Sequence, residues 1–177
     1  MNFRIAETST LGRGGFLELL DVVVEGPDGE RAHRDVIRHP GGVGVLALDG
    51  SDVLLVRQYR VAVGMPILEI PAGKLDSAEE QVEVAATREL EEEIGFSPIE
   101  LIPLGPMWPS PGYTDEVIHL FAAMGLRSTP RRPDGVEEHH SEIVRIDFAE
   151  LLSMVERGEV LDAKTQLAVL AWSRKGT

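Results

Sequence analysis

The sequence predicts a single domain of the α+β class, and three observations support this prediction. The chain has 177 residues, a size at which one domain buries a core without disulfides or structural metals. Alternating apolar and polar residues, interrupted by turn sequences, indicate strands between residues 16 and 70. Segments with helical periodicity follow that region. Separate runs of strand and helix patterns favour the α+β class.

The strand patterns begin near the amino end. Residues 16–38 alternate in polarity and are divided by Gly26-Pro27-Asp28-Gly29, which predicts a hairpin turn. A second hairpin is predicted for residues 42–48 and 53–56, with Asp49-Gly50 as its turn. Shorter strand patterns follow at 67–70, 116–122 and 143–146.

Three segments have helical patterns. The longest contains an apolar stripe at steps of four residues, formed by Val82, Ala86, Leu90 and Ile94. Asp76 or Ser77 can cap the start of this helix, and Gly95 can end it in the left-handed conformation. Two more amphipathic helices are predicted at 148–156 and 163–174, and residues 127–140 form the longest predicted loop.

Composition and charge narrow the class of protein. The chain has no cysteine and starts Met1-Asn2-Phe3-Arg4, without the apolar core of a signal peptide, so we expect a cytoplasmic protein. No apolar run approaches the length of a membrane span. A net charge of −13 argues against a nucleic-acid polymer as partner. A small anionic substrate remains compatible if a metal ion screens the charge.

The most informative segment is Arg88 to Phe96, in which four glutamates occupy the five positions from 89 to 93. Like charges four residues apart destabilise a helix by a few tenths of a kcal/mol per pair, about 0.2 to 0.5. A divalent cation would turn this penalty into a binding site, because hard ions prefer carboxylate oxygens. A solvated helix face is the alternative interpretation of such a charge run.

The segment from Gly73 to Phe96 resembles the Nudix box. The family pattern of a glutamate, seven residues, Arg-Glu, an aliphatic residue, any residue, Glu-Glu, any residue and Gly matches from Glu80 through Arg88 to Gly95. Phe96 occupies a position that is normally aliphatic. Six residues rather than five separate Gly73 from Glu80, which affects the loop before the helix and leaves the helical acids in register.

This resemblance implies the Nudix fold, an α/β/α sandwich with a mixed central β-sheet, an amino-terminal antiparallel sheet and the helix of the box. It implies hydrolysis of a nucleoside diphosphate linked to another group, assisted by Mg²⁺ or Mn²⁺. By position, the metal ligands would be Glu89, Glu92, Glu93 and the carbonyl of Ala72. Arg88 would orient the acids, and Glu80 would support the helix.

Further segments resemble the ADP-ribose pyrophosphatase subfamily of Nudix hydrolases. They are residues 56–60, residues 68–74 and the Pro109–Glu116 string, in which Pro111 lies sixteen residues beyond Gly95. The resemblance implies cleavage of ADP-ribose to AMP and ribose 5-phosphate by a homodimer. Residues 1–40 would contribute the dimerising strands of the single domain, and residues 41–177 its catalytic core.

The same resemblance suggests substrate-binding residues. Arg60 would contact phosphate or ribose, and Arg34 or Arg38 could reach the site of a partner subunit, with plain solvent exposure as the alternative. Glu69 would touch ribose or a metal-bound water, or simply end a strand. Tyr113 and Phe16 are candidate surfaces for adenine, although core packing is the favoured expectation for Phe16.

The general base is expected in the loop before the last strand. Glu138 is favoured, Glu142 is the next candidate, and His139 is a substitute because histidine takes up a proton near neutral pH. Two other functions remain open. One is hydrolysis of another nucleotide sugar, such as GDP-mannose. The other, of a different class, is a Nudix-like module that binds nucleotides without cleaving them.

Overall fold

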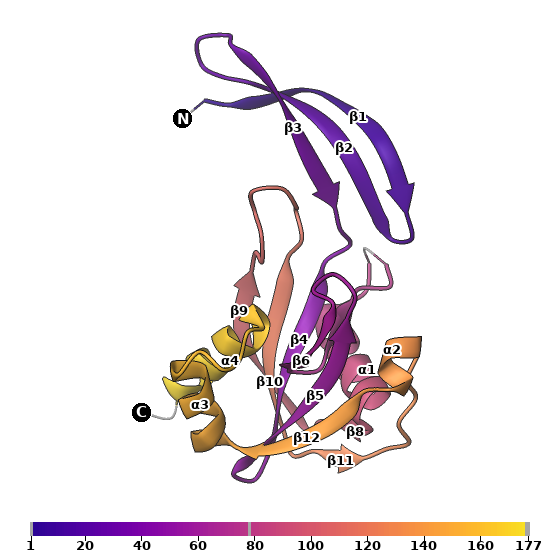
Figure 1. The fold of residues 1–177 in the computed structure, drawn as a ribbon, viewed down its shortest axis with the longest axis vertical. Coiled ribbons are helices and arrows are strands. Elements are labelled where there is room, and N and C mark those ends of the chain that lie inside the picture. Colours follow the sequence, from indigo (N-terminus) through magenta and orange to yellow (C-terminus); the bar gives the residue numbers. More distant parts are fainter. Residues whose placement is uncertain (1, 78, 176–177) are drawn as a thin grey trace. The chain divides into compact units, whose positions relative to one another are not determined.

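The computed structural model describes residues 2–77 and 79–175, and Figure 1 shows how their strands and helices are arranged. The chain forms two compact units. The first comprises Met1–Gly41 and Trp108–Val117, and the second comprises Gly42–Met107 and Ile118–Thr177. Among the described residues, no helix has the length and the apolar character of a membrane span.

The first unit contains an antiparallel sheet with the strand order β1-β2-β3. Its strands are β1 (Arg4–Gly14), β2 (Leu17–Glu25) and β3 (Arg31–Arg38). The turn between β2 and β3 is closed by the Gly26 amide, which donates to the Glu30 carbonyl at 2.9 Å. This hairpin confirms the prediction. The sequence did not indicate β1, because most of its side chains are exposed and its polarity does not alternate.

The second unit is built on a mixed sheet with the strand order β12-β5-β4-β10-β9, to which β6 adds beside β5 and β7 beside β4. Strand β10 runs parallel to β4, whereas the other pairs are antiparallel. The strands are β4 (Gly42–Asp49), β5 (Asp52–Arg60), β6 (Met65–Glu69), β7 (Ala72–Lys74), β9 (Glu100–Met107), β10 (Ile118–Met124) and β12 (Glu142–Asp147). The predicted hairpin of β4 and β5 is confirmed.

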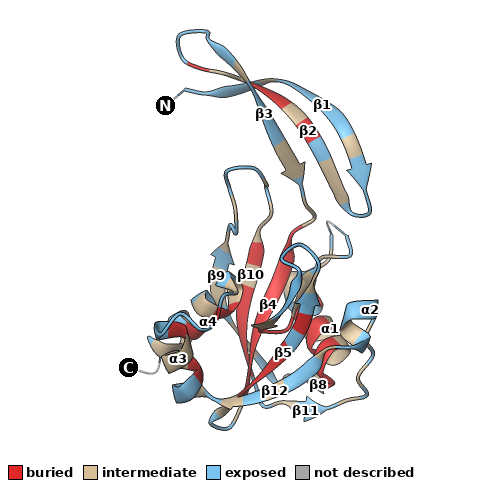
Figure 2. Cartoon of the chain, viewed as in Figure 1, coloured by how far each residue is buried: buried red, intermediate tan, exposed pale blue. Residues whose placement is uncertain are grey.

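Helices cover both faces of this sheet, which confirms the α+β prediction. Helix α1 (Val82–Ile94) packs on one face, and α3 (Phe148–Glu156) and α4 (Ala163–Ser173) pack on the other. Strand β4 is buried along most of its length in Figure 2, because its successive side chains enter opposite core layers. Val45 packs with α1, and Leu46 packs with α3 and α4.

The predicted cap of α1 is wrong. The helix begins at Val82 with Gln81 at the N-cap position, where no side chain caps the first turn. Asp76 and Ser77 lie in the preceding loop, and the Asp76 amide instead donates to the Glu80 carboxylate at 2.7 Å. The predicted end is correct, because Gly95 has a φ of 73°.

The structure differs from the sequence prediction at three further places. Strand β9 was not predicted, since Pro103, Gly105 and Pro106 interrupt its pattern. The strand expected at 116–122 is β10, shifted two residues along the chain. The long predicted loop contains a two-residue strand, β11 (Arg127–Ser128), which pairs with β8 (Phe96–Ser97), and a short helix, α2 (Val136–His139).

Helix α4 is anchored by Asp162, whose carboxylate accepts from the Thr165 amide at 2.9 Å and from the Lys164 ammonium at 2.7 Å. The Thr165 hydroxyl accepts in turn from the Ile70 amide at 2.8 Å, which ties the helix start to the end of β6. Burial would raise the pKa of Asp162, but Lys164 and the hydrogen bonds from Lys164 and Thr165 hold it below its usual value. The ionised carboxylate therefore stabilises the fold.

We expect Asp162→Ala to lower the free energy of unfolding by about 1 to 3 kcal/mol, because it removes the cap and one of the two carboxylates that pair with the Lys164 ammonium. Urea unfolding at neutral pH measures this loss. The folded pKa of Asp162 lies below the unfolded one, so this stabilisation is complete above pH 3.8 and is lost as the pH falls through the folded pKa. A difference between the two proteins that stays constant down to about pH 3 would contradict this linkage.

Candidate active site

The acid cluster consists of Glu89, Glu92 and Glu93 on α1. Packing of the apolar side of α1 against the sheet carries Glu89 and Glu93 inward, so that they are only 5% and 2% exposed. Glu92 is half-buried. The solvated helix face is therefore wrong for two of the three acids. Buried carboxylates require partners, because transfer of a charge out of water costs several kcal/mol, about 3 to 5 when its partner is removed.

Arg88 is the cation beside the acid cluster. Its Nη1 donates to Glu89 Oε1 at 2.7 Å and to Glu92 Oε2 at 3.0 Å. Its Nε donates to Glu80 Oε1 at 3.1 Å, and its Nη2 donates to the Lys74 carbonyl at 3.1 Å. One guanidinium thus links two acids of α1 to the loop that precedes the helix, as its planar fork of donors permits.

Strand β7 contacts the remaining acid. Glu93 Oε2 accepts from the Ala72 amide at 2.9 Å. The next residue, Gly73, lies so close to α1 that a Cβ there would overlap the carboxylate of Glu89. A side chain at this position would therefore displace the carboxylate of Glu89 from the place it occupies.

Burial raises the pKa of Glu89 to about 7, against the opposing effect of Arg88. Burial also raises the pKa of Glu93 to about 8, against the hydrogen bond from the Ala72 amide. The charge of Glu138 adds to both increases, and that of Glu69 adds to the second. The hydrogen bonds that the chain provides therefore do not compensate the negative charge of this region.

The donor set fits a hard divalent cation, because it consists of carboxylate oxygens next to the backbone of β7 at Ala72 and Gly73. Among the residues that the structure describes, no three His, Asp or Glu side chains are arranged to hold an ion as they stand. Glu89 and Glu92 face Arg88 instead. Arg88 contacts one oxygen of each carboxylate, so the second oxygen of each could bind a cation while Arg88 holds the first.

Arg60 and Glu69 form a second charged group in the same unit. Arg60 Nε and Nη2 donate to the two oxygens of Glu69 at 2.7 and 2.9 Å, and Glu69 is fully buried. Lys164 Nζ also donates to Glu69, at 2.9 Å. Burial would lower the pKa of Arg60, but the hydrogen bond and the charge of Glu69 keep it above its usual value, and the charge of Glu93 adds to this increase. Arg60 therefore lies within electrostatic range of the acid cluster.

Lys164 is a residue of this group that the sequence did not indicate. It lies 95 residues from Glu69 along the chain and does not belong to any of the motifs. The carboxylates of Glu69 and Asp162 outweigh the effect of burial and keep the pKa of Lys164 above its usual value. Lys164 therefore balances buried negative charge on this side of the sheet.

The candidate bases lie in different surroundings. Glu138, in α2, is half-buried, and its Oε2 accepts from the Asp134 amide at 2.8 Å. Its charge affects the buried acids of α1, as described above. Glu142 begins β12 and is exposed, 3.4 Å from Arg57 Nε. His139 is exposed. Glu138 is therefore the candidate that is partly buried, and its charge contributes to the raised pKa values of Glu89 and Glu93.

The other expected substrate residues belong to the first unit. Arg34 and Arg38 are exposed on β3, and Arg38 Nη1 donates to Glu18 at 3.3 Å. Pro111 and Tyr113 lie in the Trp108–Val117 segment, where the Tyr113 carbonyl accepts from the Ile37 amide at 2.7 Å. The end of β3 and the segment that contains Pro111 are therefore joined by main-chain hydrogen bonds.

The expectation that Phe16 packs in the core is wrong, because its side chain is 53% exposed. Its ring stands edge-on to that of His39, with 5.2 Å between the ring centroids. Tyr113 is also exposed. Both rings therefore present apolar surface outside the core of the first unit.

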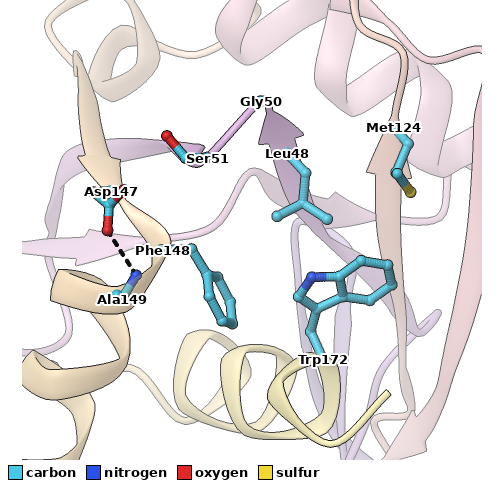
Figure 3. A pocket seen from close by; sticks show the side chains of 8 residues that line it. All are labelled: Leu48, Gly50, Ser51, Met124, Asp147, Phe148, Ala149 and Trp172. Atoms are coloured by element: carbon cyan, nitrogen blue, oxygen red, sulfur yellow. Dashed lines mark hydrogen bonds between the residues drawn. The ribbon is translucent and has the colours of Figure 1, made fainter. Parts of the chain in front are cut away.

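A separate hollow in the second unit lies between the turn after β4 and the helices α3 and α4 (Figure 3). Its volume is about 390 Å³. Phe148 and Trp172 flank it, and the Asp147 carboxylate caps α3 by accepting from the Ala149 amide at 2.9 Å. The apolar lining and the absence of convergent charged groups on it distinguish this hollow from the acid cluster.

Comparison with known proteins agrees with this geometry. Residues 38–166 match the NUDIX domain model. A crystal structure of an ADP compounds hydrolase has the same fold, with a TM-score of 0.86 and 23% identity over 99% of this chain and 96% of that chain. The Nudix fold expected from the sequence is thereby confirmed.

Three relatives are similar over most of the chain. The ADP-ribose pyrophosphatase of Bacillus subtilis (strain 168) is 38% identical over 88% of this chain and 84% of its own length. The methanol dehydrogenase activator of Bacillus methanolicus is 35% identical over 92% and 88%. A GDP-mannose pyrophosphatase of Shigella flexneri serotype 5b is 33% identical over 79% and 78%. The domain match and these identities show that the chain belongs to the NUDIX family.

Proposed function

We propose that this protein is a metal-dependent pyrophosphohydrolase that cleaves ADP-ribose to AMP and ribose 5-phosphate. The observation that carries the proposal is the acid cluster of α1, in which Glu89 and Glu93 are buried and burial raises their pKa values to about 7 and about 8. It lies in a chain that is similar over most of its length to an ADP-ribose pyrophosphatase. A surplus of buried carboxylates attracts a cation, and a bound cation in turn attracts a diphosphate.

Glu89, Glu92, Glu93 and the carbonyl of Ala72 would hold the ions in this proposal. Hydrolases of this family generally use divalent metal ions, and we propose Mg²⁺, with Mn²⁺ as a substitute. Such ions neutralise the diphosphate and lower the pKa of a bound water. Arg88 would orient the acids, because it already contacts Glu89 and Glu92.

Glu138 would act as the general base. In the hydrolysis step, the oxygen of a water molecule bonds to one phosphorus of the diphosphate. The bond from that phosphorus to the bridging oxygen breaks, the other phosphate leaves with that oxygen, and a proton of the water passes to Glu138. Two observations support this assignment over Glu142: Glu138 is half-buried, and its charge acts on Glu89 and Glu93.

Arg60 would contact the substrate from β5, held in place by its paired hydrogen bonds to Glu69. Glu69 would then act by holding Arg60, and contact with ribose remains part of its proposed role. Arg34 or Arg38 would reach the site of a partner subunit, and Pro111 and Tyr113 are further proposed substrate contacts. Exposed aromatic rings suit stacking on a nucleobase.

We further propose a cytoplasmic homodimer that forms through the strands of residues 1–40. Apolar side chains of β1 that are exposed in the single chain, including Ile5 and Leu11, support such an interface. In this proposal the two units are parts of one Nudix hydrolase domain of residues 1–177.

Two alternatives remain. Relatives named GDP-mannose pyrophosphatase support a hydrolase of another nucleotide sugar, since neither the acid cluster nor Pro111 distinguishes one nucleobase from another. A nucleotide-binding module without catalysis is the alternative of another class. The intact set of acids argues against such a module, because a binding protein has no need to keep buried carboxylates at this cost.

A substrate panel tests the proposal. We expect AMP and ribose 5-phosphate from ADP-ribose with Mg²⁺ or Mn²⁺, and no products when EDTA removes the metal. GDP-mannose, other nucleotide sugars and NAD are tested separately as alternative substrates, and the products are separated by chromatography. Rapid release of GMP from GDP-mannose without AMP from ADP-ribose would move the assignment to the first alternative, and no hydrolysis at all would favour the second.

The substitution Glu93→Gln should lower kcat by about two to three orders of magnitude, since it removes one charged ligand at almost unchanged volume. The fold should persist, because burial raises the pKa of Glu93 to about 8 and the uncharged glutamine has almost the same volume. Steady-state kinetics and thermal unfolding measure the two effects. Glu91→Gln, on the same helix but outside the acid cluster, is the matched control and should keep kcat within a few fold.

Glu138→Gln should lower kcat by about 10²- to 10⁴-fold, the usual contribution of a general base. Glu137→Gln is the matched control, because Glu137 is the exposed neighbour in α2. Rates are followed with saturating substrate and metal. If Glu142→Gln or His139→Gln causes the large loss and Glu138→Gln does not, the base is that residue.

A further inference from the structure

The position of Glu138 must be fixed by contacts outside its own helix, because α2 has only four residues and lies within a long connection between β10 and β12. A helix of one turn is not stable by itself in water. Contacts with other elements must therefore hold α2 near α1. Arg131 donates hydrogen bonds to both helices.

Arg131 joins α1 to α2 through main-chain carbonyl groups. Its Nε donates to the Glu93 carbonyl at 2.6 Å, and its Nη2 donates to the Glu138 carbonyl at 2.9 Å. Nη2 also donates to the Ser141 hydroxyl at 2.6 Å, and that hydroxyl donates to the same Glu138 carbonyl at 2.9 Å. A single guanidinium thus bridges one acid-cluster residue and the candidate base.

The end of α1 is suited to this cation. Its last carbonyl groups have no partner within the helix and carry partial negative charge, and the last turn of α1 has no basic residue of its own. Arg131 supplies the positive charge from another segment. Its rigid fork reaches two carbonyl groups at once, which the single ammonium of a lysine does less well.

Gly95 brings this segment close enough. The Thr129 amide donates to the Gly95 carbonyl at 2.8 Å. A Cβ on Gly95 would lie 3.0 Å from the Thr129 carbonyl oxygen and 3.3 Å from the Arg131 amide nitrogen. The glycine that ends α1 therefore also leaves room for the chain that delivers Arg131.

We propose that Arg131 is a positioning residue for the hydrolysis reaction, which fixes the segment of Glu138 against the carboxyl end of α1. This inference rests on the proposed role of Glu138 as base. Arg131 would not touch the substrate or the attacking water. It sets where the base stands relative to the acids that hold the metal.

Arg131→Met should lower kcat with ADP-ribose by up to about a hundredfold, the cost of a base misplaced by about 1 Å, with little change in KM. Arg131→Lys should recover part of this loss, because one hydrogen bond can form again. Arg132→Met is the matched control, since Arg132 is the exposed neighbour in the same segment. A loss shared by Arg132→Met, or a change confined to KM, would overturn the proposal.

A double-mutant cycle separates positioning from a general effect on the fold. In the Glu138→Gln background, Arg131→Met should cause no further fall in kcat, because the group that Arg131 positions no longer acts. An equal fall in kcat with and without Glu138 would show a structural role and would overturn the proposal.

Hydrogen exchange tests the contact without relying on activity. The amides of His139, His140 and Ser141 donate within α2 and its end, so their exchange reports the opening of this turn. Arg131→Met should make them exchange roughly tenfold faster, while α1 stays protected. Unchanged exchange would overturn the proposal. If the wild-type protein releases no AMP from ADP-ribose, the proposed function fails, and exchange still decides whether Arg131 holds α2.

Discussion

The constraint on which the second unit depends is the burial of negative charge between α1 and the sheet. The apolar side of α1 must pack for the core to form, and that packing carries Glu89 and Glu93 out of water. Arg88 and one main-chain amide compensate part of this charge, and Arg60 and Lys164 compensate the nearby Glu69. These contacts do not fully offset the effect of burial, so the pKa values of Glu89 and Glu93 are raised. Core packing thus creates the demand for a cation.

Two glycines make this arrangement sterically feasible. Gly73 lets the chain after β6 pass against the carboxylate of Glu89, and Gly95 ends α1 with a positive φ. Gly95 also accommodates the segment that delivers Arg131. Backbone approach at these two points therefore places the interior of the helix at Glu89 and its carboxyl end at Gly95 close to the neighbouring segments.

Much of the fold could be predicted, because hairpins and amphipathic helices leave local patterns. The turn at Gly26–Gly29, the start of α3 at Phe148 and the end of α1 at Gly95 are examples. Strand β1 and the N-cap of α1 could not, since β1 is mostly exposed and the predicted capping residues bond within the preceding loop instead. Local capping propensity was overridden there by the contacts of Glu80 with Asp76 and Arg88.

The sequence by itself determined which acids α1 carries, their spacing and the family to which they point, because a helix converts spacing directly into a shared face. Only the tertiary structure decided that two of these acids are buried and that the charge of Glu138 contributes to their raised pKa values. It also decided that Lys164 contacts Glu69 and that Arg131 contacts the carbonyl groups of Glu93 and Glu138. These contacts join residues far apart in the chain, and such pairs leave no periodic signal in a single sequence.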